Sequence, residues 1–235
     1  MRSSQLAPFL LGAKKSTPIV IGYIPIAIAF GVLARQSHLP LYSTLLMSII
    51  VFAGASQFMA VNMLATGAAS IEIIIATFIL NLRHMIMSLS LMNLLSRIPT
   101  GWKTLLSFGI TDESFAVATL ESTKEPDIAN QYFILGLFAS AYSSWVLGTA
   151  VGAILYTWIP PTISDSMSVA LYAMFIGLLI PAVKAAWRRG IIAAISIALC
   201  SLFYWKFQLS MGWSIVFATI IGSMAGIWIR EEETA

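Results

Sequence analysis

The chain has 235 residues, of which 59% are hydrophobic and only 10% charged, and its net charge is +3. Soluble domains carry about 25% charged residues. This chain therefore has too little polar surface to fold as a globule in water, and we expect an all-α integral membrane protein. The small positive charge fits Lys and Arg at the loop positions that orient membrane helices, and it calls for no nucleic-acid partner.

Long apolar runs predict about seven transmembrane helices in a single polytopic membrane domain, residues 1–235. A spanning helix needs about 20 mostly apolar residues. The runs that come near this length are, in chain order, 17–34, 41–65, 70–96, 132–156, 167–183, 190–205 and 213–229. The loops between them are short, so membrane lipid is the expected surrounding for most of the chain.

The first predicted span contains the sequence GYIP, in which two residues favour a helix break. Proline at position 25 lacks the backbone donor that a helix needs, and Gly22 precedes it by three residues. We expect Gly22 and Pro25 to kink this span, more as a structural feature than as part of a binding site.

The second predicted span contains the sequence FAGASQF, residues 52–58. Gly54 permits a close helix approach or a break, and Ser56 and Gln57 bring polar groups to the middle of the span. In one interpretation these residues only pack helices together, with Gln57 bonded to a neighbour. In the other, the helix breaks here, and its free backbone groups meet a zwitterionic ligand together with Ser56 and Gln57.

The third predicted span carries an arginine and a histidine in the sequence NLRH. Asn81 and His84 share one helix face, while Arg83 points about 100° away from His84. Ionisable groups inside a membrane span are costly and suggest a function. Arg83 is predicted to bind a substrate carboxylate, to pair with Asp112 or Glu113, or both. His84 either exchanges protons, as its ordinary pKa near 6.5 allows, or donates to a backbone carbonyl.

The segment 103–120 contains the sequence GITDESFA and is ambiguous as a span. Thr111 followed by Asp112 and Glu113 is typical of a helix N-terminus, with Gly109 at its entry. A charged residue at a helix centre costs about 2.5–3.5 kcal/mol on insertion scales, which favours a broken or re-entrant segment over a crossing helix. Asp112 and Glu113 are either proton or counter-ion sites, or a capping loop that pairs with Arg83 or other basic residues.

A faint internal repeat relates residues 30–61 to residues 147–183. If 103–120 does not cross, three helices make up each copy and the copies are inverted, as in many secondary transporters. The positive-inside rule then places the N-terminus outside. If 103–120 does cross, the copies are parallel and both termini lie inside.

Motifs of the common enzyme classes are absent. The sequence has no Walker A pattern, HExxH, GxSxG or glycine-rich dinucleotide turn. Its two histidines and one cysteine are scattered, so we expect no metal site and no cofactor. A membrane enzyme is the weaker interpretation.

The order and spacing of six short motifs resemble the AzlC/BrnF-type large subunit of bacterial branched-chain amino acid exporters. The resemblance covers residues 17–229, and its motifs are GYIP (22–25), AFG (29–31), FAGASQF (52–58), NLRH (81–84), GITDESFA (109–116) and SSWVLGT (143–149). It implies export of leucine, isoleucine and valine, with methionine as a further candidate, across the bacterial cytoplasmic (inner) membrane. It also implies energy from the proton gradient and a small AzlD/BrnE-type membrane subunit as partner. The alternatives are a membrane channel or a scaffold subunit for another small-solute system.

The residues are compatible with this implied substrate. An apolar amino acid needs a cation for its carboxylate, an acid for its ammonium group and an apolar wall. Arg83 offers the cation, and Asp112 or Glu113 the acid. The second predicted span offers the wall, through Phe52, Phe58, Met59 and Met63.

Overall fold

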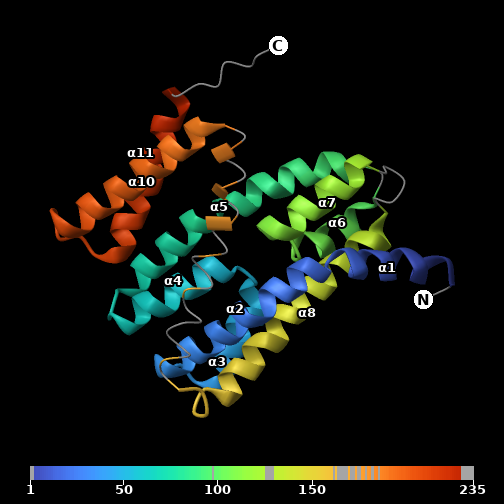
Figure 1. The fold of residues 1–235 in the computed structure, drawn as a ribbon, viewed down its shortest axis with the longest axis horizontal. Helices are drawn as coiled ribbons and strands as arrows, with labels where there is room; N and C mark the ends of the chain where they lie inside the picture. Colours follow the sequence, from blue (N-terminus) through green and yellow to red (C-terminus); the bar gives the residue numbers. More distant parts are fainter. Residues whose placement is uncertain are drawn as a thin grey trace. The chain divides into compact units, whose positions relative to one another are not determined.

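The computed structural model describes residues 3–96, 98–124, 130–160 and 186–228, together with 162, 169, 173, 176–177, 179–180 and 183–184. Within these residues the ordered elements are all helices, which confirms the all-α prediction (Figure 1). They are α1 (Ser3–Lys15), α2 (Thr17–Gln36), α3 (Leu41–Leu46), the π-helix η1 (Met47–Val51), α4 (Gly54–Ala65), α5 (Ser70–Leu94), α6 (Thr100–Ser107), α7 (Asp112–Lys124), α8 (Gln131–Leu155), α10 (Trp187–Trp205) and α11 (Met211–Trp228).

Contacts divide the chain into two units. The first unit contains Met1–Phe58 and Asn81–Ser168, and the second contains Met59–Leu80 and Val169–Ala235. Helices α4 and α5 each contribute residues to both units. All the polar side chains singled out by the sequence, from Ser56 to Glu113, belong to the first unit.

The first unit is built on α8, which packs along both α1 and α2 (Figure 1). At one end, a Cβ built on Gly12 would lie 2.0 Å from the carbonyl oxygen of Phe133, and at the other end a Cβ on Gly152 would lie 2.1 Å from that of Ile28. The segment formed by α1 and α2 therefore runs in the same direction as α8 along their contact. Glycine allows this close backbone approach, as small residues do in membrane helix pairs.

Helix α2 runs unbroken from Thr17 to Gln36. The helix does not break at Gly22 or Pro25, because it continues through both residues, and the kink expected there stays a prediction. Pro25 is exposed, and a Cβ on Gly22 would meet nothing within 4 Å. The surface of the helix thus accommodates the proline ring without ending the helix.

Residues 41–65 do not form one continuous helix, in contrast to the span predicted there. The chain passes from α3 into η1, and Phe52 then adopts a left-handed conformation with φ 40° and ψ 50° before α4 begins at Gly54. A positive φ is rare for a bulky residue and marks a local strain. The break predicted at FAGASQF is therefore present, two residues before Gly54.

The segment 41–58 folds back on itself, and we call it the first hairpin. It starts beyond the C-terminal end of α2 and reaches Phe52, whose ring lies 6.3 Å from that of Tyr23 in the first half of α2. It then returns, because the ring of Phe58 lies 5.5 Å from that of Phe30, further toward the C-terminal end of α2.

The segment 100–124, the second hairpin, enters from the opposite end of α8. The ring of Trp102 lies 5.6 Å from that of Tyr132, in the first turn of α8. Along the chain, Phe108 then contacts the ring of Tyr142, with 5.8 Å between the centroids. Helix α6 thus runs alongside α8 in the same direction.

Helix α7 reverses this direction. It begins beside α2, because the hydroxyl of Tyr23 donates at 2.7 Å to Thr111, the residue before α7. Near the end of α7, Glu121 pairs with Lys15 at 2.5 Å. Lys15 is the last residue of α1. Both ends of the second hairpin therefore lie at the N-terminal end of α2 and α8. The helix is broken between Ser107 and Asp112, as predicted, while a re-entrant path of 103–120 in the membrane stays a prediction.

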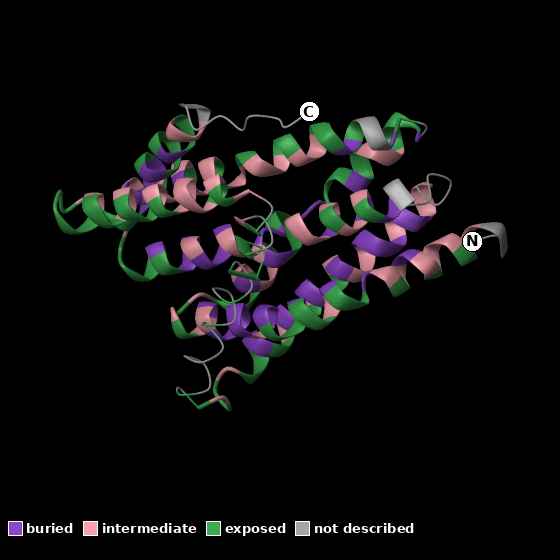
Figure 2. Ribbon diagram, turned by 45° about the horizontal axis from the view of Figure 1, so that its top comes forward, coloured by how far each residue is buried: buried purple, intermediate pink, exposed green. Residues whose placement is uncertain are grey.

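The second unit contains α10 and α11, which pack against each other, and the first half of α5. Met63, Ala76 and Val216 form its buried core cluster. Helix α10 has no buried residue although its sequence is strongly apolar, as expected of a helix that faces lipid (Figure 2).

Among the described residues, four helices are long and apolar enough to cross a membrane: Thr17–Gln36, Ser70–Met92, Gln131–Leu155 and Trp187–Trp205. Helix Met211–Gly226 is apolar but shorter. The predicted span at 167–183 lies largely outside the described residues. About seven crossings, and the inverted repeat, remain predictions.

Candidate functional site

The two hairpins meet beside α2 and α8, within the first unit. Tyr142 of α8 contacts both tips, because its ring lies 5.1 Å from Phe52 and 5.8 Å from Phe108. Its hydroxyl also donates to the carbonyl oxygen of Ile49 in η1, at 2.9 Å. Tyr23 likewise contacts Phe52 of the first hairpin and Thr111 of the second. The two breaks in the helices therefore face one region.

A glycine at each break presses against an aromatic side chain of α8. A Cβ on Gly54 would lie 2.6 Å from the indole ring of Trp145, and one on Gly109 would lie 2.6 Å from the Cβ of Phe138. Both residues were predicted as helix-break positions, and both are located at the tip of a hairpin. Close approach to α8 is the physical reason for glycine there.

Helix α7 begins with a reciprocal cap formed by Thr111 and Ser114. The backbone N–H of Ser114 donates to Thr111 Oγ1 at 3.2 Å, and the backbone N–H of Thr111 donates to Ser114 Oγ at 2.8 Å. Ser114 Oγ also donates to the carbonyl oxygen of Gly109 at 2.9 Å. This is the capping-box pattern with serine as the third residue, and it places Asp112 and Glu113 in the first turn.

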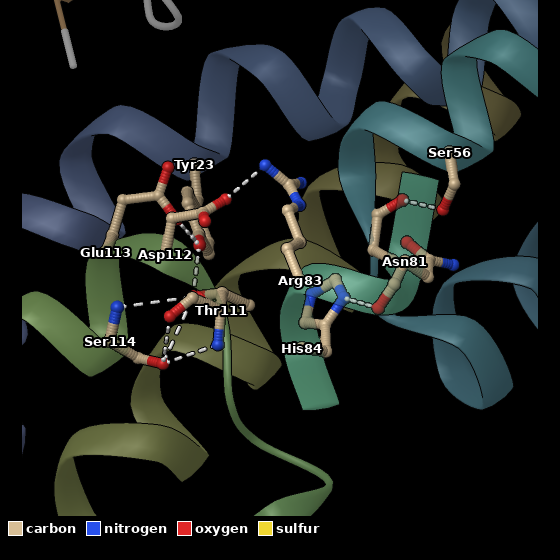
Figure 3. A network of polar contacts seen from close by, with 10 residues as sticks. Tyr23, Ser56, Asn81, Arg83, His84, Thr111, Asp112, Glu113 and Ser114 are labelled. Carbon is tan, nitrogen blue, oxygen red and sulfur yellow. Dashed lines mark hydrogen bonds and ion pairs between the residues drawn. The ribbon is translucent and has the colours of Figure 1, made fainter. Parts of the chain in front are cut away.

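Arg83 and Asp112 form an ion pair between α5 and the start of α7 (Figure 3). Arg83 Nη1 lies 2.7 Å from Asp112 Oδ2, and the two side chains are 33% and 29% exposed. A half-buried pair of this kind is held by charge yet stays accessible to a competing ion. One of the two roles predicted for Arg83, pairing with an acid, is thus present in the structure.

Glu113 is engaged separately from Asp112. The hydroxyl of Tyr23 donates to Glu113 Oε2 at 2.5 Å, and the same hydroxyl lies 2.7 Å from Thr111 Oγ1 (Figure 3). Tyr23 is only 4% exposed. The adjacent acids therefore face different elements, Asp112 toward α5 and Glu113 toward α2.

Asn81 and His84 flank Arg83 on α5. The Nδ1 atom of His84 lies 3.2 Å from the backbone carbonyl oxygen of Asn81, so the histidine takes the backbone partner that was one of its two predicted roles (Figure 3). The side-chain oxygen Oδ1 of Asn81 is buried and has no hydrogen-bond partner among the described residues. It is an acceptor at the same level of α5 as the ion pair.

Gln57 and Ser56 are used inside the protein. Gln57 Nε2 donates to Ser48 Oγ at 3.0 Å, and Trp145 Nε1 donates to Gln57 Oε1 at 3.0 Å. Ser48 in turn shares a hydrogen bond of 2.8 Å with Thr149 of α8. Ser56 Oγ donates to the carbonyl oxygen of Ala53. These buried bonds fix the first hairpin to α8, which is the packing role proposed as one alternative for Gln57.

The predicted apolar wall is divided by the fold. Phe52 lies at the hairpin tip near Tyr23, whereas Phe58 packs on Phe30. Met63 is buried in the core cluster of the second unit, with Met59 packed against that cluster. Phe52 is therefore the member of the predicted wall that lies near the acids of α7.

The sequence did not single out Tyr23 or Tyr142. Tyr23 stands inside GYIP, a motif examined for its glycine and proline, and Tyr142 stands among small residues of α8. A hydroxyl within an otherwise apolar span is the signal that would have selected both, because buried tyrosines need a hydrogen-bond partner. No group of His, Cys, Asp and Glu able to hold a metal ion occurs among the residues described.

Comparison with known proteins gives a family match over most of this site. The model of the family described as AzlC protein matches residues 18–159, which include both hairpins and α8. No solved structure matches the chain.

Three similar proteins show the extent of this likeness. "Inner membrane protein YgaZ" of Escherichia coli K12 is 29% identical over 226 residues, 94% of this chain and 92% of that protein. An uncharacterised membrane protein of Archaeoglobus fulgidus is 33% identical over 230 residues, covering 97% of this chain and 98% of its own length. "Branched-chain amino acid transport protein AzlC" of Bacillus subtilis is 26% identical over 180 residues, 76% of this chain and 69% of that protein.

Proposed function

The chain belongs to the AzlC family, and on this premise we propose that it is a secondary transporter that exports branched-chain amino acids across the bacterial cytoplasmic membrane. It is a multi-pass membrane protein of a transport family. The substrates proposed are leucine, isoleucine and valine, with methionine as a further candidate. The name of the Bacillus subtilis relative, branched-chain amino acid transport protein AzlC, supports this substrate class.

The observation that carries the proposal is the Arg83–Asp112 ion pair at the tip of the second hairpin. A cation and an acid in contact match the two charged groups of an amino acid, one each. The pair is half-buried and joins two separate elements, α5 and α7. Discontinuous helices whose ends meet a charged substrate are a recurring feature of secondary transporters.

We envisage that the charged groups of the substrate replace the contact between Arg83 and Asp112. When a substrate binds, its carboxylate takes the place of Asp112 at Arg83, and its ammonium group moves to Asp112. Asn81 Oδ1, buried without a partner among the described residues, is a further acceptor for that ammonium group. The apolar side chain would then lie against the aromatic rings at the hairpin tips, of which Phe52 and Tyr142 are the nearest to each other.

The direction of the hairpins supports an orientation with the N-terminus in the cytoplasm. Among the described basic residues of the first unit, Lys14, Lys15, Lys103 and Lys124 belong to the end of α2 and α8 where the second hairpin enters, and Arg35 belongs to the other end. The positive-inside rule assigns the more basic end to the cytoplasm. The sequence alone left the side of the N-terminus open, external if residues 103–120 do not cross the membrane and cytoplasmic if they do.

Proton coupling and a small membrane partner subunit complete the proposal. Both come from the resemblance to the AzlC/BrnF-type exporters. Glu113, in the first turn of α7 and bonded to Tyr23, is the acid that the Arg83 pair leaves available for a proton. A channel or a scaffold subunit remains the alternative function.

The test is transport by purified protein in liposomes, with and without the small subunit. We expect saturable leucine flux that responds to a pH gradient. Non-saturating leucine leak would indicate a channel instead, and the absence of flux while the partner alone is active would indicate a scaffold. Arg83→Ala and Asp112→Asn proteins that still transport at the parental rate would overturn the site assignment.

A further inference from the structure

The hydroxyl of Tyr23 has one proton and two acceptors. Glu113 Oε2 lies 2.5 Å away and Thr111 Oγ1 lies 2.7 Å away. A hydroxyl donates one hydrogen bond at a time. Which acceptor the proton serves is therefore decided by which of the two oxygens is the stronger acceptor.

The protein holds this hydroxyl in place from both sides of its ring. The ring of Tyr23 packs edge-on against Trp145, with 5.3 Å between the centroids, and against Phe52 at 6.3 Å. Because Tyr23 is almost fully buried, water has little access to compete for its proton. The hydroxyl can change its acceptor by rotation about its own C–O bond without any movement of the ring.

The two acceptors belong to different parts of the start of α7. Glu113 is titratable, whereas Thr111 caps the helix through the backbone N–H of Ser114. Among the described residues, the other charged or titratable groups near Glu113 are Asp112 on the same turn, and Arg83 and His84 on α5. Arg83 is paired with Asp112, and the hydroxyl of Tyr23 donates to Glu113.

We propose that Tyr23 is a positioning residue that couples the protonation of Glu113 to the N-terminal cap of α7, and so to the position of Asp112 opposite Arg83. This inference rests on the proposed transport function. When Glu113 is ionised, the Tyr23 hydroxyl donates to its carboxylate. When Glu113 has taken a proton from water on one side, its own O–H donates to the Tyr23 oxygen, and the Tyr23 hydroxyl turns to Thr111.

The proton leaves Glu113 to water on the other side, and Tyr23 keeps its own proton throughout. The cap at Thr111 thus accepts from Tyr23 in one state and not in the other. Because Asp112 is the next residue, this change reaches the ion pair directly along the chain. Asp112 is left for the substrate and Arg83, while Glu113 carries the coupling proton.

The test compares leucine transport by the parent and Tyr23→Phe proteins in liposomes, together with the small subunit. Phenylalanine keeps the ring contacts and removes only the hydroxyl. We expect leucine–leucine exchange to stay close to parental, while flux driven by a pH gradient falls about tenfold, as loss of one hydrogen bond to a charged group allows. Tyr132→Phe, which also removes one tyrosine hydroxyl but lies beside Trp102 in the first turn of α8, is the matched control and should keep the parental pH response.

A second pair of variants covers the case in which Tyr23→Phe does not fold. Thr111→Val removes the other acceptor and should reduce the pH response, and Thr111→Ser should restore it.

In a Glu113→Gln background, Tyr23→Phe should cause no further loss of the pH response. A parental pH response in Tyr23→Phe or Thr111→Val, or an equal loss with and without Glu113, would overturn the inference. If the parent protein itself moves no leucine, the proposed function fails, and the inference fails with it.

Discussion

Reversal of the Arg83–Asp112 ion pair separates a structural role of Arg83 from a substrate-binding role. The variants are Arg83→Asp, Asp112→Arg and the double exchange that carries both. Each single change places two like charges at the contact that is now 2.7 Å long. The double exchange restores an opposite pair with the two charges in each other's place.

The size of the effect follows from the exposure of the pair. Fully exposed ion pairs contribute about 0–1 kcal/mol, and breaking a fully buried one costs about 3–5 kcal/mol. With side chains 33% and 29% exposed, the Arg83–Asp112 pair lies between these cases, so we expect a coupling free energy of about 1–3 kcal/mol. In a binding or transport constant this corresponds to a change of about 5- to 150-fold.

Thermal unfolding in detergent and leucine export from cells are the two assays. We expect each single variant to lose stability and export, and the double exchange to recover the stability but not the export, because the cation has moved from α5 to α7. Exchange of Lys15 and Glu121, the pair at the far end of α7, is the matched control and should leave export unchanged. If the Arg83–Asp112 exchange restored export to the parental rate, Arg83 would be a structural residue and the substrate-binding role would be refuted.

Two further predictions concern the packing and the path of the chain. Gly152→Leu should lower the free energy of unfolding by about 1–3 kcal/mol through overpacking, because a Cβ at this position would lie well inside ordinary contact distance of Ile28. Gly22→Ala, at an open position, is the control and should be neutral or stabilising in the same thermal unfolding assay. Single cysteines introduced as Lys103→Cys and Gln131→Cys in a Cys200→Ser protein should react with an impermeant thiol reagent from one side of the membrane, and Ser37→Cys from the other. Reaction of Lys103→Cys and Gln131→Cys from opposite sides would show that residues 103–120 cross.

Residue patterns were sufficient to predict the class of the protein and the helix breaks at FAGASQF and GITDESFA, whereas the break positions proposed at Gly22 and Pro25 were wrong because α2 continues through both. The low charge content required a membrane protein, and a glycine near a polar cluster marked both FAGASQF and GITDESFA. The acids of α7 were also correctly matched with Arg83 as a candidate partner, because few charges exist in the spans and each needs a partner. These inferences depend on local composition and on the cost of burying charge.

The path of the chain after each break could not be read from local sequence. A hydrophobic run as long as 41–65 fits one crossing as well as two half-helices, and only the contact of Phe58 with Phe30 shows that it returns. Tyr23 was missed for the same reason, since its partners Thr111 and Glu113 are distant in sequence. The contact of α2 with α8 did have a local signal, the pattern Gly148-x-x-x-Gly152, which is typical of closely packed membrane helices.

Efflux of labelled leucine from cells that lack this chain tests the proposed function most directly. The measurement follows intracellular leucine, valine, isoleucine and methionine after loading, with the chain restored alone, with its small subunit, or as the Arg83→Ala protein. We expect export to return only when the parental chain and the small subunit are both present. Unchanged intracellular levels of all four amino acids under every condition would contradict branched-chain amino acid export.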